Sequence, residues 1–373
     1  MNDRLKQFGD LINRLIAGKS LSREEVRQAV MQILKDATTE IHQGAFLAAV
    51  TAKGPTPDEI AGAWQAIYEE DTTRADPQTE TPVLDNCGTG MDGFKTFNIS
   101  TAAAVVAAAG GVPLARHGAR AITSRCGTVD LCEAVGVDVE CPVPAVTASI
   151  ERVGIGLYNG MSPFVHPRAL FRILSRMSFG SILNIAASLA NPARPRLGVR
   201  GVYAGDMAMP VAQVMREIGY RKAIVLHGSA AEGVGGMDEL TPVGDNLAAE
   251  LMPDGQIRSY TIAPAAVGVR FNGSIRDIAA GPDPQTEALR LIRVFAGKDH
   301  GALFETICLN TAPIFYLADN TEDLKSGFEK ARELIQGGQA LKRLRQWVKA
   351  QNTAPEAGAK RFDDLANLVE NET

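Results

Sequence analysis

Between Asp85 and Thr101, glycines and small polar residues are spaced so that they could bind phosphate. The segment places glycines at 88, 90 and 93 and then opens an alanine-rich helix with Asn98, Ser100 and Thr101. Bare glycines let a backbone approach an anion closely, and the first turn of a helix offers unpaired N–H groups and partial positive charge. The segment therefore predicts a cradle for a phosphorylated small molecule.

Asp238 and Glu239 form a second group with recognisable chemistry. They follow an apolar strand at Ala223 to His227 and a glycine-rich stretch at Gly228 to Gly236. Adjacent carboxylates in such a loop suit coordination of a hard cation such as Mg²⁺. A solvated acidic loop is the alternative interpretation, and the neighbouring phosphate motif makes it the weaker one.

The stretch from Gly88 to Gly93 also has the form G-x-G-x-x-G, which alone is a weak signal. A dinucleotide site needs the helix to start at the glycines and an acidic residue about 20 positions later. Here residues 94–97 intervene, and the next apolar segment ends in Arg116-His117-Gly118, without a carboxylate. A tight structural turn explains one glycine but not all three. The phosphate cradle is therefore the favoured interpretation.

The elements around these residues indicate two kinds of structure. Residues 1–75 read as helices, with a capping box at Ser22 and Glu25 and a second helix start at Thr56, Pro57 and Glu59. After a polar linker, short apolar strands alternate with helices, which predicts a mainly parallel sheet flanked by helices. The expected strands lie around Val83 and at 112–115, 154–158, 199–203 and 223–227. We therefore expect an α/β protein with a small all-helical domain and a larger α/β domain.

The expected boundaries follow from the same patterns. Residues 167–183 turn helical again and are expected to join the helical domain of residues 1–75. The α/β domain would then comprise residues 76–166 and 184–352. Residues 353–373 read as a polar C-terminal tail, in which Phe362, Leu365, Leu368 and Val369 could form one amphipathic helix.

Composition excludes several classes of function. The 373 residues carry a formal net charge of −5, which argues against general nucleic-acid binding because duplex affinity rests on Lys and Arg. No run reaches the ~18 apolar residues of a membrane span, and no signal peptide opens the chain. Five cysteines without a Cys-x-x-Cys pair fit free thiols in a reducing compartment, so a cytoplasmic location is expected.

Six motifs in order resemble the anthranilate phosphoribosyltransferase family, of the nucleoside phosphorylase class, over most of residues 11 to 350. The family's Gly-Thr-Gly-Gly-Asp loop corresponds to Gly88 to Asp92, and its Asn-x-Ser-Thr helix start corresponds to Asn98 to Thr101. Its Lys-His-Gly-Asn-Arg turn corresponds to Arg116 to Arg120. Its His-Pro segment corresponds to His166-Pro167, its Asn-Pro segment to Asn191-Pro192, and its Asp-Glu pair to Asp238-Glu239. Six ordered elements are far more specific than any one of them.

The resemblance implies roles for individual residues. Those expected to bind phosphoribosyl diphosphate are Gly88, Thr89, Gly90, Asp92, Asn98, Ser100, Thr101, Arg116 (in place of the family lysine) and Thr128. Those expected on the acceptor side are His117, Ala119, His166 and Arg176, with Arg172 as the alternative arginine. Ser100, Asp238 and Glu239 are expected to bind Mg²⁺.

The implied reaction displaces diphosphate at the anomeric carbon and joins the ribosyl phosphate to the amine of anthranilate or a related aromatic acceptor. Such a reaction rests on positioning and on stabilising the leaving group, and no residue is assigned as nucleophile or base. With anthranilate, the step belongs to tryptophan biosynthesis. The resemblance also implies a homodimer formed through the helical domain and no membrane partner.

Four further positions depart from the family pattern, and two alternatives stay open. Met91 replaces the second glycine of the Gly-Gly pair, Ala119 replaces an asparagine, and Ala187 and Ser188 replace a glycine and a proline. One alternative is a non-catalytic or differently specific relative that binds another ligand or nucleic acid. The other is a nucleoside phosphorylase, which shares the architecture but uses inorganic phosphate.

Overall fold

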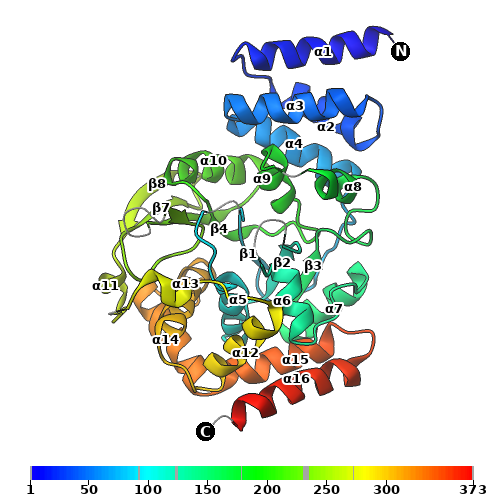
Figure 1. The fold of residues 1–373 in the computed structure, drawn as a ribbon. Helices are drawn as coiled ribbons and strands as arrows, with labels where there is room; N and C mark the ends of the chain where they lie inside the picture. Colours follow the sequence, from blue (N-terminus) through cyan, green and yellow to red (C-terminus); the bar gives the residue numbers. More distant parts are fainter. Residues whose placement is uncertain are drawn as a thin grey trace.

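The computed structural model describes residues 2–90, 93–121, 125–177, 179–229, 235–271 and 273–371. A layer of helices from the N-terminal part of the chain lies at one end of the molecule, and a sheet flanked by helices makes up the rest (Figure 1). The expected fold class, a small helical domain with a larger α/β domain, is confirmed.

Four helices form the N-terminal layer: α1 (Asn2–Ile16), α2 (Arg23–Leu34), α3 (Glu40–Lys53) and α4 (Pro57–Glu70). The capping boxes predicted at Ser22 and Thr56 are both formed, each with a glutamate three residues later. Each box satisfies backbone N–H groups that a helix start leaves unpaired. The starts of α2 and α4 are therefore encoded locally.

Two short helices far along the chain share the core of this layer: α8 (Leu170–Arg176) and α9 (Ile182–Ser188). Asp71, at the end of α4, accepts the amides of Arg168, Ala169 and Leu170 at 2.6, 3.0 and 2.7 Å. The Trp64 indole donates to the Leu189 carbonyl at 2.9 Å. These bonds tie the segment that follows His166 to the N-terminal helices.

The central sheet has the strand order β3-β2-β1-β4-β5-β7-β8, and β6 pairs with β5. Neighbours from β3 to β5 are parallel, whereas β6, β7 and β8 are antiparallel. The strands are β1 (Leu84–Gly88), β2 (Leu114–Gly118), β3 (Ile155–Asn159), β4 (Leu197–Gly201), β5 (Lys222–Ser229), β6 (Gly236–Met237), β7 (Asn246–Leu251) and β8 (Ile257–Ile262).

The antiparallel edge was not among the predicted strands. β7 reads Asn-Leu-Ala-Ala-Glu-Leu, and Ala, Glu and Leu are good helix formers. Pairing with β5 along six residues overrides that local preference. The five parallel strands lie in the segments where the sequence predicted them, within a few residues.

Helices cover both faces of the sheet. On one face α10 (Ala208–Ile218) packs with α4 and α9, and on the other the alanine-rich α5 (Ile99–Ala109) packs against α13 (Ala302–Leu317) and α15 (Gln339–Ala350). The remaining helices are α6 (Thr128–Ala134), α7 (Val143–Val153), α11 (Pro264–Val267), α12 (Pro284–Phe295), α14 (Leu324–Gln336) and α16 (Pro355–Glu370), with short 3-10 turns at Gly205–Met207 and Ile275–Ile278.

The segment predicted as a polar tail forms helix α16, which packs on α15 and α12. Phe362, Leu365 and Val369 are buried in the core of the α/β unit, whereas Leu368 is 56% exposed. Three of the four apolar residues thus form the buried stripe, and the fourth lies outside it. Within the described ranges, no helix has the length and apolar character needed to cross a bilayer.

Candidate functional site

The carboxyl ends of the central strands mark the candidate site. β1, β2 and β4 each end in glycine, at Gly88, Gly118 and Gly201. In open α/β sheets, ligands bind outside the carboxyl ends of the strands, where helices and loops diverge. The predicted phosphate-binding segment begins at the end of β1, and α5 follows it.

Asp238 fits against two of these strand ends. A Cβ on Gly88 would overlap the Asp238 carboxylate, and one on Gly201 would overlap its backbone carbonyl. Asp238 Oδ2 accepts the backbone N–H of Gly90 at 2.7 Å, and Gly90 has φ +68°, which favours glycine. Because Gly88 and Gly201 have no side chain, the nearly buried Asp238 carboxylate can lie against the start of the loop.

Glu239 and Thr89 border the same place. Glu239 Oε2 accepts from the Thr96 hydroxyl at 3.3 Å, which connects the Asp-Glu pair to the strand-like segment before α5. The Thr89 hydroxyl is buried and has no hydrogen-bond partner among the described residues, although its amide donates to Gly201 O at 3.2 Å. The next part of the loop, which contains Met91 and the predicted donor-site residue Asp92, lies outside the described residues.

Helix α5 begins without a side-chain cap from Asn98. The Asn98 amide instead donates to the Cys126 carbonyl at 3.2 Å, across to the start of α6. Asn86 donates to the Ser100 carbonyl at 2.7 Å from the end of β1. The first turn of α5 is thus fixed from two sides, and its backbone N–H groups donate no hydrogen bond to the Asn98 side chain.

Arg116 lies beneath this first turn. Its guanidinium is 1% exposed and donates to Ser100 Oγ at 3.1 Å, Thr101 Oγ1 at 2.7 Å and Asn86 Oδ1 at 3.1 Å. Burial lowers the pKa of Arg116 from its ordinary value. Arg116 therefore places a positive charge directly under the two hydroxyl residues that the sequence predicted for phosphate binding.

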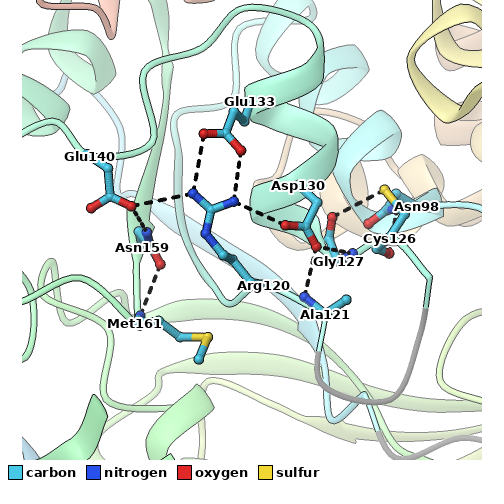
Figure 2. A network of polar contacts seen from close by, with 10 residues as sticks. All are labelled: Asn98, Arg120, Ala121, Cys126, Gly127, Asp130, Glu133, Glu140, Asn159 and Met161. Carbon is cyan, nitrogen blue, oxygen red and sulfur yellow. Dashed lines mark hydrogen bonds and ion pairs between the residues drawn. The ribbon is translucent and has the colours of Figure 1, made fainter. Parts of the chain in front are cut away.

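The segment between β2 and α6 is held by a polar network (Figure 2). Asp130 Oδ2 accepts the amides of Ala121 and Gly127, each at 2.9 Å, and so fixes both ends of the segment. Arg120 donates to Asp130 at 3.2 Å and to Glu133 at 2.8 Å, and its other terminal nitrogen lies 3.6 Å from Glu140. Glu140 in turn accepts from Asn159 at the end of β3.

Thr128 and Ala119 belong to this same segment. Thr128 is the first residue of α6, and its methyl group lies within 3.0 Å of where a Cβ on Gly118 would be. The Ala119 carbonyl accepts from Val129 N at 3.3 Å. Both residues therefore lie beside the end of β2.

The two predicted histidines meet. His117 Nε2 and His166 Nε2 are 3.1 Å apart, and both side chains are buried. His166 Nδ1 lies 2.6 Å from the Asp71 carbonyl. Burial lowers the pKa of both imidazoles below the ordinary value, and for His117 the neighbouring His166 lowers it further.

The predicted acceptor arginines lie elsewhere. Arg176 is exposed and pairs with Glu40 of α3 at 2.6 Å. Arg172 donates to the Ile33 carbonyl at 3.4 Å and lies 3.7 Å from Asp36. Both therefore face the N-terminal helices and are engaged there.

Sequence reasoning missed a buried ion pair. Arg200 of β4 donates to Asp85 of β1 at 3.0 Å, with the two side chains 1% and 0% exposed. Burial raises the pKa of the Asp85 carboxyl from its ordinary value. A single arginine in the apolar run Leu-Gly-Val-Arg-Gly offers no spacing signal, so this pair could be found only from the fold.

The oxygen atoms at the strand ends fit a hard cation in part. Asp238, Glu239 and the unpartnered Thr89 hydroxyl are all oxygen donors, the type that Mg²⁺ prefers. The described residues contain no group of three or more His, Cys, Asp or Glu side chains that could hold a metal alone. Mg²⁺ usually keeps few protein ligands and takes the rest from substrate phosphates and water.

Two family models match the chain. The helical bundle domain of the glycosyl transferase family matches residues 9–70, and the a/b domain of that family matches residues 80–341. Together they span both structural units described above.

Curated relatives match over nearly the whole length. An anthranilate phosphoribosyltransferase of Methanosarcina acetivorans is 35% identical over 345 residues, which is 92% of this chain and 90% of that protein. One of Myxococcus xanthus is 34% identical over 335 residues, covering 90% of this chain and 96% of the relative.

Solved structures show the same architecture. The anthranilate phosphoribosyltransferase of Thermus thermophilus aligns with a TM-score of 0.81 and 31% identity over 92% of this chain and 99% of that one. The Saccharomyces cerevisiae enzyme in complex with PRPP and Mg aligns with a TM-score of 0.80 over 93% of this chain and 98% of that one, at 23% identity.

Proposed function

The chain belongs to the glycosyl transferase family and, within it, to the anthranilate phosphoribosyltransferases; from this we propose that it transfers a 5-phosphoribosyl group from phosphoribosyl diphosphate to the amine of anthranilate. One observation in the structure carries the proposal: the Asp238 carboxylate fits against Gly88 and Gly201 and holds the start of the glycine loop beside α5. The product belongs to tryptophan biosynthesis.

The donor would bind at the carboxyl ends of β1 and β4. Its phosphates would accept hydrogen bonds from Gly88, Thr89 and Gly90, from Asn98 and Ser100, and from Thr101 and Thr128, the residues expected from the sequence. The positive end of α5 and the Arg116 guanidinium beneath it support an anion there. Asp92 is proposed as a further donor-site residue on sequence alone.

Mg²⁺ would be held by Asp238, Glu239 and Ser100 together with the diphosphate oxygens. The oxygen donor set fits this ion, and a yeast relative was solved with PRPP and Mg. When bound, Mg²⁺ supplies positive charge that neutralises the leaving diphosphate.

The protein's own residues would catalyse transfer by positioning and by charge. As the bond from the anomeric carbon to the diphosphate breaks, negative charge grows on the leaving group beside backbone amides that are already in place. The amine of anthranilate attacks the carbon and needs no strong base. His117, His166 and Ala119 remain the proposed acceptor-side residues from the sequence. Arg176 is proposed there on sequence alone, since in this structure it pairs with Glu40.

Pairing of two chains through the helical domain is part of the proposal. Ile16 at the end of α1 is 72% exposed and Ile41 at the start of α3 is 82% exposed, both in the N-terminal layer. Exposed apolar side chains that gather on one surface mark protein–protein interfaces, and α1 and α3 pack against each other in this layer. Replacing Ile41→Glu should shift the mass measured by light scattering from dimer to monomer, whereas Leu368→Glu, on α16, should leave it unchanged. A wild-type monomer at micromolar concentration would contradict this pairing.

A cytoplasmic location is proposed as well. All five cysteines are free, and Cys126, Cys132, Cys141 and Cys308 are buried. Free thiols are typical of a reducing compartment. The comparisons give no support to a nucleoside phosphorylase or to a nucleic-acid-binding relative.

The function is tested by diphosphate release from phosphoribosyl diphosphate, Mg²⁺ and anthranilate. Asp238→Asn should reduce the affinity for phosphoribosyl diphosphate about 10- to 100-fold, because a hydrogen-bonded charge in a nearly buried site contributes about 1.5–3 kcal/mol. Asp245→Asn, an exposed aspartate a few residues on, is the matched control and should change little.

No diphosphate release, with no heat of binding for phosphoribosyl diphosphate, would overturn the assignment. Phosphate-dependent release of a base from nucleosides would favour the phosphorylase instead. A salt-sensitive shift of short DNA in a gel would favour the nucleic-acid-binding relative.

A further inference from the structure

Residues 238–245, which begin with the acidic pair Asp238 and Glu239, form neither helix nor strand. A backbone in such a segment still needs hydrogen-bond partners where it is buried, because an unpaired buried N–H or C=O costs free energy. Leu240 and Thr241, the two residues that follow the pair, are both fully buried. Their N–H and C=O groups therefore need partners from other parts of the fold.

One side-chain amide supplies both partners of Leu240. Asn310 Oδ1, from α13, accepts the Leu240 N–H at 2.8 Å, and Asn310 Nδ2 donates to the Leu240 carbonyl at 2.8 Å. Asn310 is 7% exposed, and its Nδ2 also donates to the Thr306 carbonyl within α13 at 2.9 Å. The amide thus pairs with Leu240 as a residue of a neighbouring strand would, and its own helix fixes its orientation.

A second amide does the same for Thr241. Asn246 Oδ1, from the first residue of β7, accepts the Thr241 N–H at 2.7 Å, and Asn246 Nδ2 donates to the Thr241 carbonyl at 3.1 Å. The Asn246 side chain is fully buried, and its Nδ2 also donates to the Ile262 carbonyl of β8 at 3.2 Å. The two residues after the acidic pair are therefore bound by α13 and by β7.

The backbone of the acidic pair lies tightly against the sheet. A Cβ on Gly201 of β4 would lie 1.6 Å from the Asp238 carbonyl oxygen, and one on Gly228 of β5 would lie 2.3 Å from the Glu239 carbonyl oxygen. The pair therefore has no room to move towards the sheet. Movement away from the sheet would stretch the bonds that Asn310 makes to the next residue.

Helix α13 also supports the phosphate side of the donor site. It packs against α5, whose first turn carries the hydroxyl residues expected to bind phosphate. Asn310 therefore connects the acidic pair to the same helix on which α5 rests. Mg²⁺ demands near-ideal octahedral geometry, so its carboxylate ligands and the diphosphate oxygens must lie at a fixed separation.

We propose that Asn310 and Asn246 are positioning residues for the magnesium site. Their amides fix the two peptides after Glu239 and so hold the carboxylates of the acidic pair where the cation needs them. Neither asparagine would contact the cation or the substrate. The assignment rests on the proposed function, because it takes the acidic pair to bind Mg²⁺ together with phosphoribosyl diphosphate.

The principal variant is Asn310→Leu, which has a similar volume but no polar side-chain atom. Gln351→Met is the matched control, because the fully buried Gln351 pairs with the N–H and C=O of Leu157 in the same way, at 2.8 and 2.9 Å. Leu157 lies in the edge strand β3, whereas Asp238 lies against β1 and β4. Both variants lose buried hydrogen bonds, so both should lower the melting temperature.

Calorimetry of phosphoribosyl diphosphate binding at increasing Mg²⁺ concentration separates positioning from stability. In Asn310→Leu, the Mg²⁺ concentration for half-maximal binding should rise about 10-fold, because displaced carboxylates no longer match the geometry of the ion. In Gln351→Met, it should stay within about two-fold of the wild type. In assays of diphosphate release, saturating Mg²⁺ should restore most of the rate of Asn310→Leu, and the KM for anthranilate should change less than about two-fold.

A milder variant keeps the test decisive if Asn310→Leu does not fold. Asn310→Ser has a hydroxyl that can bond to the Thr306 carbonyl within α13 but is too short to pair with both groups of Leu240. It should raise the Mg²⁺ concentration for half-maximal binding about three-fold. A folded variant of either kind with the Mg²⁺ dependence of the wild type would overturn the proposal. An equal rise in Gln351→Met would overturn it as well.

The test also distinguishes this proposal from the proposed function. If Mg²⁺-dependent binding of phosphoribosyl diphosphate weakens in the Asn310 variants but the wild type releases no diphosphate with anthranilate, the positioning role stands and the transferase assignment fails. If the wild type releases diphosphate and the Asn310 variants keep its Mg²⁺ dependence, the transferase assignment stands and the positioning role fails. Absence of Mg²⁺-dependent binding in the wild type would overturn both.

Discussion

At the scale of single residues, two buried histidines lie in contact among the predicted acceptor-side residues. His117 and His166 contact each other through Nε2 and lie away from solvent. Burial disfavours the charged form of an imidazole, so the folded protein holds both rings neutral. The free energy of unfolding therefore depends on pH through this pair.

We expect stability to fall as the pH drops below about 6.5, the ordinary histidine pKa. There the unfolded chain binds protons that the folded chain does not, so each histidine removes about 1.4 kcal/mol per pH unit until its lowered folded pKa is reached. Above that pH both states are neutral, and the contribution to stability is complete. Urea unfolding between pH 7.5 and 5 measures this dependence.

The variant His117→Gln/His166→Gln isolates the effect from acid titration of carboxylates. Its free energy of unfolding should change less steeply with pH than that of the wild type over the same interval. Equal slopes for the two proteins would show that the histidines do not carry the dependence. The exposed His300 provides a control, since His300→Gln should keep the wild-type slope.

At the scale of elements, the site is made where strand ends, a glycine loop and the first turn of α5 meet. Asp238 fits only because Gly88 and Gly201 have no side chain. Arg116 and Asn86 then fix the first turn of α5 from the end of the sheet. These interactions place backbone amides before any ligand arrives, which is the arrangement that electrostatic catalysis requires.

Replacing Gly88→Ala should displace the Asp238 carboxylate and break its bond to Gly90 N. We expect the affinity for phosphoribosyl diphosphate to fall at least ten-fold while the protein stays folded, as measured by calorimetry and thermal melting. Gly44→Ala, in α3 with open space at its Cβ, should bind normally and gain about 0.5–1 kcal/mol in stability. Normal binding by Gly88→Ala would contradict this account of the loop.

The sequence predicted those features of the site that depend on local chemistry. Glycine spacing, the start of α5 and the Asp-Glu pair could be recognised because each is encoded within a few residues. The position of Arg116 beneath Ser100 could not, because a 16-residue separation along the chain is closed only when β2 pairs with β1. Arg200 was missed for the same reason, since its partner Asp85 lies 115 residues away.

At the scale of the whole molecule, two cores on either side of the sheet unite distant parts of the chain. One core joins α2, α4, α8, α9 and α10, and the other joins α5, α12, α13, α15 and α16. The sequence predicted helices and a mainly parallel sheet from periodicity, but it did not predict that the C-terminal residues enter the second core. The packing of the C-terminal residues depends on which surface of α15 faces them, and the periodicity of the sequence does not show this.

The C-terminal helix should therefore contribute to global stability. Phe362→Ala should lower the free energy of unfolding by about 3–5 kcal/mol, the usual cost of emptying a buried aromatic site. Leu368→Ala, on the exposed side of the same helix, should change it by less than about 0.5 kcal/mol. Denaturant unfolding decides between these outcomes, and equal effects of the two substitutions would place α16 outside the folded core.

The fit of Asp238 between two glycines separates the position of the carboxylate from the length of chain that leads to it. Its place is set by β1 and β4, strands far away in sequence, and by β6, which leads into Asp238 and pairs with the end of β5. Insertions or deletions before Gly236 can therefore accumulate during evolution while the acidic group stays in place. Variation in that connection is a route by which substrate access could diverge without rebuilding the chemistry.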